Sequence, residues 1–397
     1  PNPVPPVGPP LALYVHIPWC LRKCPYCDFN SYTCSETPPF ERYVAQLLAD
    51  LEHELCSAWA RRPLGSIFIG GGTPSLLPGP AARRLLDGIR DRAELAPDCE
   101  ITVEANPGAA DARRFDDFRA AGVNRLSIGV QSLSAPHLQR LGRIHDPAEA
   151  RAALGMARAA GFDNVNLDLM FALPGQTRAE ATQDMEALLA LAPEHLSYYQ
   201  LTLEPDTRFH AHPPEVPDAD LAAEMAEGGR ERLAAAGYHR YEVSAYARAG
   251  HRCRHNLNYW RFGDYLGIGA GAHGKLTEVR AGDSGWVIRR TAKHRHPETY
   301  LSHDRDALVG EQRTLSEDDT LFEFALNALR LTDGLETGLI TAATGLPWSK
   351  LMPQVEAAMR EGLLGLDGDH IRPTALGRDF LDDLVSRFMP REPDADD

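Results

Sequence analysis

Short apolar segments alternate with longer segments of helical periodicity through the first 205 residues. The apolar segments are rich in β-branched and aromatic residues, which is typical of strands. They are residues 11–17, 66–70, 100–106, 125–131, 164–171 and 196–203. Helical patterns lie between them at residues 40–55, 80–95, 111–122 and 146–161. Six such units predict parallel strands joined by right-handed helical crossovers.

Five successive strands end in loops with polar residues or glycines. These loops read WC, GGGTPS, EANP, VQS and DLMFALPGQT. In doubly wound sheets and in barrels alike, the carboxyl ends of the strands carry the chemistry. A single site assembled from five successive units suits a barrel best. We therefore predict an α/β fold with a partial barrel of six βα units.

The pattern changes after residue 205. A helix is predicted at 218–237 and a strand or hairpin at 238–247. Further on, helices near 317–332, 336–343 and 349–362 precede a hairpin that turns at Asp367-Gly368-Asp369, and a last helix follows. This order is typical of a winged helix. Residues 311–390 carry fourteen acidic and seven basic side chains, so packing against the barrel or docking a protein is favoured over DNA contact.

We expect five parts along the chain. They are a flexible proline-rich N-terminus (1–10), the partial barrel (11–205), a barrel extension (206–310), a winged-helix-like domain (311–388) and an acidic tail (389–397).

Composition is that of an ordinary globular protein, with 43% apolar and 24% charged residues among 397. The net charge of -15 argues against a broad surface for nucleic acid or anionic lipid. The long uncharged stretch at residues 64–82 contains glycines and prolines that make it a poor membrane span. The N-terminal residues do not read as a signal peptide, and we expect a cytoplasmic protein.

Seven cysteines, an odd number, favour reduced thiols over a disulfide framework. Cys20, Cys24 and Cys27 are clustered in CLRKCPYC, whereas the other four are spread out and are interpreted as packing residues. Three thiolates in one loop suit an iron–sulfur cluster that leaves one iron open. A closed zinc site needs four ligands, so zinc would require His16 or a distant residue as the fourth.

CLRKCPYC, together with YVHIPWC, GGGTPS, VEANP, SIGVQS, DLMFALPGQT and HNLNYW, resembles the radical S-adenosylmethionine (SAM) superfamily over residues 11–388. The branch it resembles comprises the oxygen-independent coproporphyrinogen III dehydrogenases and the HemW-type haem chaperones. The resemblance implies a TIM-like partial (βα)6 barrel and a 4Fe–4S cluster on Cys20, Cys24 and Cys27, whose open iron is chelated by SAM. It also implies a set of residues beside SAM or the cluster, namely Tyr14, Tyr26, Gly71, Gly72, Thr73, Glu104, Gln131, Arg143 and Asp168.

Phe29 departs from the dehydrogenase pattern, in which a further cysteine stands two positions after the third ligand. Phenylalanine neither ligates iron nor exchanges a proton, so this departure favours the chaperone branch. A second feature agrees with it, because HNxxYW is associated with haem in that branch. Its residues are His255, Asn256, Tyr259 and Trp260. Imidazole is a common haem ligand, and the aromatic pair offers flat apolar surface.

The expected function is therefore a haem chaperone that passes haem to an acceptor such as a respiratory haemoprotein. The alternative is a coproporphyrinogen dehydrogenase acting through a 5'-deoxyadenosyl radical, and a third class is a zinc-stabilised interaction module. The resemblance is also compatible with an electron donor as a partner and with transient contact with a membrane protein. His251, Cys253 and His255 alternate and would share one side of an extended strand, but we interpret them as solvent-facing residues of a basic turn rather than as a metal site.

Overall fold

The computed structural model describes residues 8–34, 36–108, 113–279 and 285–390. Most of the predicted proline-rich N-terminus and acidic tail, and the start of the helix predicted at 111–122, lie outside these ranges.

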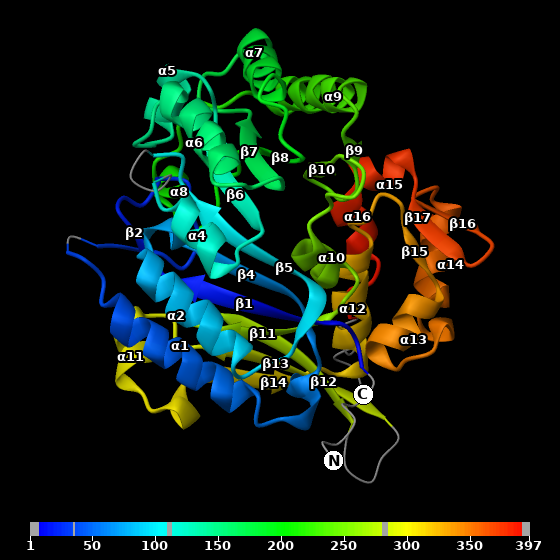
Figure 1. Ribbon diagram of the computed structural model, residues 1–397. Coiled ribbons are helices and arrows are strands. Elements are labelled where there is room, and N and C mark those ends of the chain that lie inside the picture. Colours follow the sequence, from blue (N-terminus) through cyan, green and yellow to red (C-terminus); the bar gives the residue numbers. More distant parts are fainter. Residues whose placement is uncertain (1–7, 35, 109–112, 280–284, 391–397) are drawn as a thin grey trace.

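Six parallel strands form the centre of one large sheet (Figure 1). They are β1 (Leu11–Ile17), β4 (Leu64–Gly71), β5 (Leu95–Ala105), β6 (Arg125–Gln131), β7 (Val165–Phe171) and β8 (His195–Gln200). They correspond to the six predicted strands. Their neighbours in the sheet follow the order of the chain, which is what successive right-handed crossovers produce.

Helices cover the outer side of these strands and bury their apolar sides against them. They are α1 (Phe40–Glu54), α2 (Gly79–Arg90), α4 (Phe115–Ala121), α6 (Pro147–Ala159), α7 (Arg178–Leu189) and α9 (Ala219–Ala235), and the short α5 (Ala135–Arg140) precedes α6 in the chain. Asp146 and Thr177 form capping boxes with Glu149 and Glu180, which fix the first turns of α6 and α7. The helical faces and the strands share one continuous hydrophobic core.

The sheet continues beyond both ends of the parallel set. At the β8 end lie β9 (His239–Arg240) and β10 (Ala245–Ala247), which form the predicted hairpin. At the β1 end, β11 (Asp264–Ile268) runs parallel to β1, and β12 (His273–Val279), β13 (Trp286–Lys293) and β14 (Val309–Thr314) follow in antiparallel order. The sequence did not predict β11 to β14, because glycines interrupt GIGAGAHG and β14 has little buried surface.

The C-terminal part has its own hydrophobic core. Its helices are α12 (Glu317–Ala328), α13 (Gly338–Thr344), α14 (Met352–Arg360), α15 (Ala375–Asp379) and α16 (Leu381–Ser386), and its strands are β15 (Leu335–Glu336), β16 (Leu364–Asp367) and β17 (His370–Pro373). The strand order β15-β17-β16 and the turn at Gly368 and Asp369 give the winged-helix arrangement. Phe262 of the barrel extension enters this core and packs edge-on against Phe324. The two parts therefore share an apolar contact beside α10 (Arg254–Trp260).

The segment around Cys253 corrects one prediction. It is neither an extended strand nor a solvent-facing turn, because α10 begins at Arg254, and Cys253 and His255 are fully buried. The carboxylate of Glu100 on β5 accepts hydrogen bonds from the backbone N–H of Arg254 (3.0 Å) and from Cys253 Sγ (3.5 Å). This distant carboxylate is the hydrogen-bond acceptor for the first backbone N–H of α10, and sequence spacing alone does not reveal it.

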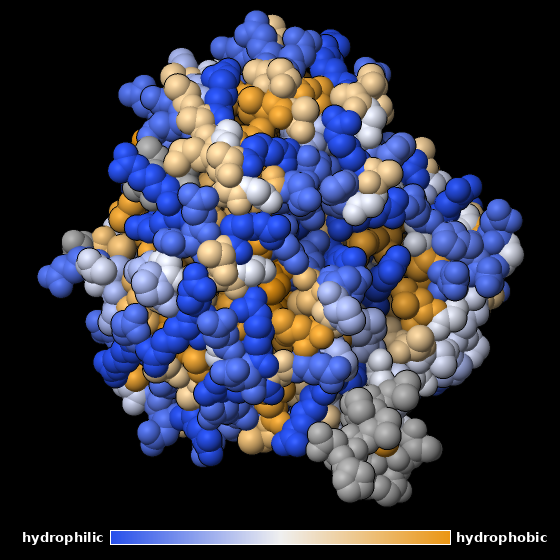
Figure 2. Space-filling view, viewed as in Figure 1, coloured by the Kyte–Doolittle hydropathy of each residue, from blue (hydrophilic) through white to orange (hydrophobic). Residues whose placement is uncertain are grey.

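The face seen in Figure 2 is mostly hydrophilic, with scattered apolar side chains. Among the described residues, no helix combines the length and apolar character that crossing a bilayer requires.

Candidate cofactor and ligand site

A cavity of about 730 Å³ lies inside the partial barrel, between the cysteine loop and α10. Every site residue predicted from the sequence lines it. At one end are Cys20, Cys24, Cys27, Tyr26, Gly71, Gly72, Thr73, Gln131 and Arg143, with Tyr14, Glu104 and Asp168 further along and His255, Asn256, Tyr259 and Trp260 at the α10 end. The structure thus joins the two predicted groups of residues in one space of ordinary ligand-site size.

The cysteine loop follows β2 (Trp19–Cys20) and turns tightly between Cys24 and Cys27, whose backbone N–H donates to Cys24 O at 3.1 Å. Lys23 Nζ donates to Phe29 O (3.1 Å) and Ser31 O (3.2 Å), which holds the far side of the loop. All seven cysteines of the chain are free. Burial raises the pKa of Cys20 and Cys27.

His16, which the sequence offered as a fourth ligand for zinc, has both ring nitrogens engaged in the structure. Within the described ranges, no three His, Cys, Asp or Glu side chains are placed to hold a single metal ion. The ring of His16 is buried, with Nδ1 3.0 Å from the Tyr14 hydroxyl and Nε2 2.8 Å from Asn30 O. Burial lowers its pKa to about 4, so it is a neutral residue of the core with both nitrogens engaged.

Gly71 and Gly72 form a cradle under the cysteine loop. Gly71 has a φ of +117°, which favours glycine. A Cβ on Gly72 would lie 2.6 Å from Trp19 O and 3.0 Å from Cys20 Sγ. The same loops are joined by a hydrogen bond from Thr73 N to Trp19 O (2.8 Å). The glycines therefore let the end of β4 approach the cysteine loop more closely than any side chain would allow.

Two carboxylates face the middle of the cavity. Burial and the negative charge of Asp168 raise the pKa of Glu104 to about 7, and burial raises the pKa of Asp168. Glu104 accepts a hydrogen bond from Gly71 N (3.1 Å), and Asp168 accepts one from Asn166 (2.8 Å). Among the described residues, neither makes an ion pair. Such a pair suits a ligand that brings a positive charge and hydroxyl groups.

Arg143 crosses from the cysteine loop to β6. Its Nη2 donates to Asn106 Oδ1 and Gly129 O, both at 2.7 Å, and its Nη1 lies 3.7 Å from Cys24 Sγ. Its Nε is buried without a partner in the described part of the chain. Nearby, Gln131 has a φ of +66° and accepts a hydrogen bond from the Tyr199 hydroxyl (2.7 Å).

These donors and acceptors fit a cluster with bound SAM. The cysteines supply three sulfur ligands, the carboxylates suit the ammonium and the ribose hydroxyls of SAM, and the unpartnered Nε of Arg143 suits its carboxylate.

The α10 end of the cavity is aromatic. The rings of Phe68 and His255 stack with centroids 5.0 Å apart, and Tyr259 meets His255 edge-on at 4.8 Å. His255 Nδ1 lies 2.9 Å from Ser66 Oγ and Nε2 lies 3.0 Å from the Tyr259 hydroxyl. Burial lowers the pKa of His255 to about 3. The imidazole is thus neutral, and ligation of iron would require one of these two hydrogen bonds to be exchanged.

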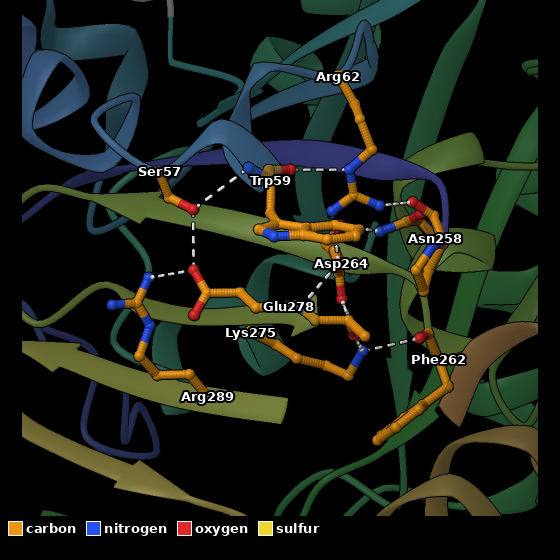
Figure 3. Close-up of polar contacts among 11 residues, drawn as sticks. Ser57, Trp59, Arg62, Asn258, Phe262, Asp264, Lys275, Glu278 and Arg289 are labelled. Atoms are coloured by element: carbon orange, nitrogen blue, oxygen red, sulfur yellow. Dashed lines mark hydrogen bonds and ion pairs between the residues drawn. The ribbon is translucent and has the colours of Figure 1, made fainter. Parts of the chain in front are cut away.

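A buried polar network holds the end of α10 in place (Figure 3). Asp264 is 0% exposed and receives Arg62 Nη2 at 2.6 Å and Lys275 Nζ at 2.8 Å. Lys275 also donates to Phe262 O (3.0 Å), and Asn258 Nδ2 donates to Asp264 O (2.8 Å). This network is not evident from the sequence, because its members come from three segments that no local pattern connects.

The C-terminal domain also contacts α10. The guanidinium of Arg330 lies 4.3 Å from the ring centroid of Trp260, a cation–π contact, and pairs with Glu242 (3.1 Å). Trp260 Nε1 is buried, and no described residue accepts its hydrogen bond. The second domain therefore packs against Trp260, one of the aromatic residues that line this end of the cavity.

Further polar residues that the sequence analysis did not single out line the cavity. They are Asn106, Arg125, Asn166, His195, Ser197 and Ser244. Several occupy alternate positions of one strand, as do Arg125, Ser127, Gly129 and Gln131 on β6, and so face the same side of the sheet. This alternation along the strand is the sequence pattern from which these cavity-lining positions could be predicted.

The fold and the cysteine loop define the class. The radical SAM superfamily matches residues 14–188, and the HemN C-terminal domain matches residues 315–380. In three dimensions the chain resembles a solved structure entitled "Coproporphyrinogen III oxidase (HemN) from Escherichia coli is a Radical SAM enzyme", with a TM-score of 0.79 and 23% identity over 97% of this chain and 91% of that one. The protein is thus a radical SAM protein, and the predicted fold class is confirmed.

Curated relatives define the family more narrowly. Heme chaperone HemW of Escherichia coli K12 is 48% identical over 96% of this chain and 98% of its own length, and HemW of Haemophilus influenzae is 44% identical over 97% and 99%. Radical S-adenosyl methionine domain-containing protein 1 of mouse mitochondria is 37% identical over 96% of this chain and 87% of its own length. The chain belongs to the HemW family, as the sequence motifs predicted.

Proposed function

We propose that this protein is a haem chaperone that binds a 4Fe–4S cluster, SAM and haem in one cavity and transfers haem to an acceptor protein. The observation that carries the proposal is that the cysteine loop and the HNxxYW residues line the same cavity. Relatives named as heme chaperones, which match nearly the whole chain, support it.

Cys20, Cys24 and Cys27 would hold the cluster, which when bound supplies an open iron for SAM and a route for an electron. Arg143 would pair with the carboxylate of SAM, and Glu104 and Asp168 would receive its positively charged and hydroxyl groups. Tyr14, Tyr26, Gln131 and the loop at Gly71, Gly72 and Thr73 would enclose it. Burial of the carboxylates supports this assignment, because water would otherwise weaken their attraction for a cation.

Haem would lie against the aromatic surface at the α10 end. Tyr259 and Trp260 are partly exposed toward the cavity, and Asn256 lies beside them. Their ring faces would contact the macrocycle. His255 would either support this surface through its hydrogen bonds or exchange one of them for the iron.

Coproporphyrinogen oxidation is the second candidate, and the likeness to the HemN structure extends only to the fold. Phe29 lines the cavity and is 58% exposed, so the position after the third cysteine meets solvent but offers no thiol. This supports the chaperone over the dehydrogenase.

The division into parts at residues 11–205, 206–310 and 311–388 is proposed to have functional meaning. The barrel would hold the cluster and SAM, the extension would bring α10 to the haem, and the C-terminal domain would brace α10 through Arg330 and Trp260. The acceptor is proposed to be a respiratory haemoprotein. The free cysteines support a reducing compartment such as the cytoplasm.

Two assays on the anaerobically reconstituted protein test the proposal together. In the first, haem is titrated into the parent protein and into a Trp260→Ala variant, with Trp59→Ala as a matched control outside the cavity. We expect saturable binding that weakens about tenfold in the Trp260 variant alone. In the second, reduced protein, SAM and coproporphyrinogen III are incubated together, and we expect no protoporphyrinogen IX. Product formation without haem binding would establish the dehydrogenase instead.

A further inference from the structure

A buried guanidinium stands at the α10 end of the cavity. Arg125 is the first residue of β6, is only 2% exposed and lines the cavity. Among the described residues, its side chain has no partner in a hydrogen bond or an ion pair, and its Nε is buried and unsatisfied. A buried charge without a partner is costly, so a site of this kind indicates a ligand that supplies the partner.

The groups around Arg125 are already engaged with other residues. Glu100 holds the start of α10, and Asp168 accepts from Asn166. His195 has Nδ1 2.6 Å from Asn166 Oδ1 and Nε2 2.9 Å from the Tyr241 hydroxyl. The carboxylates near Arg125 therefore influence its pKa only across space, and burial together with the charge of Arg125 lowers the pKa of His195 and His255. The guanidinium is cationic and free to bind an anion.

Arg125 stands at the opposite end of β6 from Gln131, and its charge acts across space on Glu104 and Asp168, which face the middle of the cavity. Gln131 lies six residues further along the same strand. At about 3.3 Å per residue this corresponds to roughly 20 Å. Arg143, which contacts Cys24, stands with Gln131 at the cysteine end. One cavity thus contains two arginines with unsatisfied Nε groups, one at each end.

We propose that Arg125 binds a carboxylate of the ligand that lies against α10, namely a propionate of haem. This inference rests on the proposed function. Arg125 and His255 line the same cavity, so a macrocycle that lies against the aromatic residues would present the carboxylates at its edge to the guanidinium. Arg143 takes the carboxylate of SAM, so the two arginines sort two carboxylate ligands to opposite ends of the cavity. A guanidinium suits this role because it pairs with a carboxylate through two parallel hydrogen bonds.

The test compares haem with its dimethyl ester, in which both propionates have lost their charge. Both are titrated into the full-length protein after anaerobic cluster reconstitution, and SAM affinity is measured in parallel. The parent protein should bind haem at least tenfold more tightly than the diester. Arg125→Met should reduce haem affinity about tenfold and leave diester affinity unchanged, whereas Arg125→Lys should restore part of the preference for haem.

Arg143→Met is the matched control at the other end of the cavity. It should weaken SAM binding and keep the preference for haem over the diester. Arg125→Met should keep SAM binding and lose the preference for haem. Equal affinity of the parent protein for haem and for the diester would overturn the inference. It would also be overturned if Arg125→Met weakened the binding of haem and of the diester by the same factor. Absence of haem binding by the parent protein would refute the proposed function as well, so the two failures are distinguishable.

Discussion

Gly72 lies directly under the cysteine loop, and its replacement by alanine tests how closely the two loops must approach. The added Cβ would lie 2.6 Å from Trp19 O and 3.0 Å from Cys20 Sγ. Ordinary contacts of carbon atoms begin near 3.5 Å, so the loop must move by nearly 1 Å. Overpacking of this kind costs about 1–3 kcal/mol. The shift also strains the hydrogen bond from Thr73 N to Trp19 O, which is worth about 1 kcal/mol.

We therefore expect Gly72→Ala to lose about 2–4 kcal/mol of unfolding free energy and to take up less iron and sulfide than the parent protein. Urea unfolding and iron and sulfide analysis after anaerobic reconstitution measure the two effects. Gly155→Ala is the matched control, because no atom lies within 4 Å of its added Cβ in α6. That change should stabilise the helix by up to about 1 kcal/mol. A Gly72→Ala protein with parental stability and full cluster content would refute the proposed close packing of the two loops.

Two further predictions concern buried charges. Burial raises the pKa of Glu104 to about 7, so the negative charge that attracts the SAM cation is lost as the pH falls from 8 to 6. The affinity for SAM should therefore weaken over that range in the parent protein but not in Glu104→Gln. An affinity of the parent protein that does not change with pH would contradict this assignment. Lys275→Met leaves Asp264 paired with Arg62 alone, so the free energy of unfolding measured by urea titration should drop by about 3 kcal/mol. The same replacement of the exposed Lys350 should change the free energy of unfolding little. A loss below about 1 kcal/mol in Lys275→Met would show that Lys275 is dispensable.

The barrel could be predicted because its determinants are local. Each apolar segment and each helical pattern is readable within a few residues, and parallel strands necessarily bring the loops after Ile17, Gly71, Ala105 and Gln131 to one end. This topology explains why residues far apart in sequence line one cavity at the cysteine end.

The structure at the α10 end of the cavity could not be predicted, because it depends on contacts between distant segments that local patterns do not encode. The start of α10 is held by Glu100, more than 150 residues earlier, and its end by the buried pair of Asp264 and Lys275. Without those contacts, the alternation of Cys253 and His255 resembles a strand. Arg125 likewise looks like an ordinary first residue of a strand until the fold places it inside the barrel.

Binding of SAM at an open iron requires that three cysteines alone hold the cluster. The decisive measurement is iron and sulfide content, with the electron paramagnetic resonance spectrum of the reduced protein recorded before and after SAM is added. The parent protein and a Cys34→Ala variant should contain about four irons and four sulfides per chain and show a spectrum that changes with SAM. Replacement of Cys20, Cys24 and Cys27 by alanine should abolish both. Cluster assembly that survives this triple replacement, or a spectrum that ignores SAM, would contradict the account.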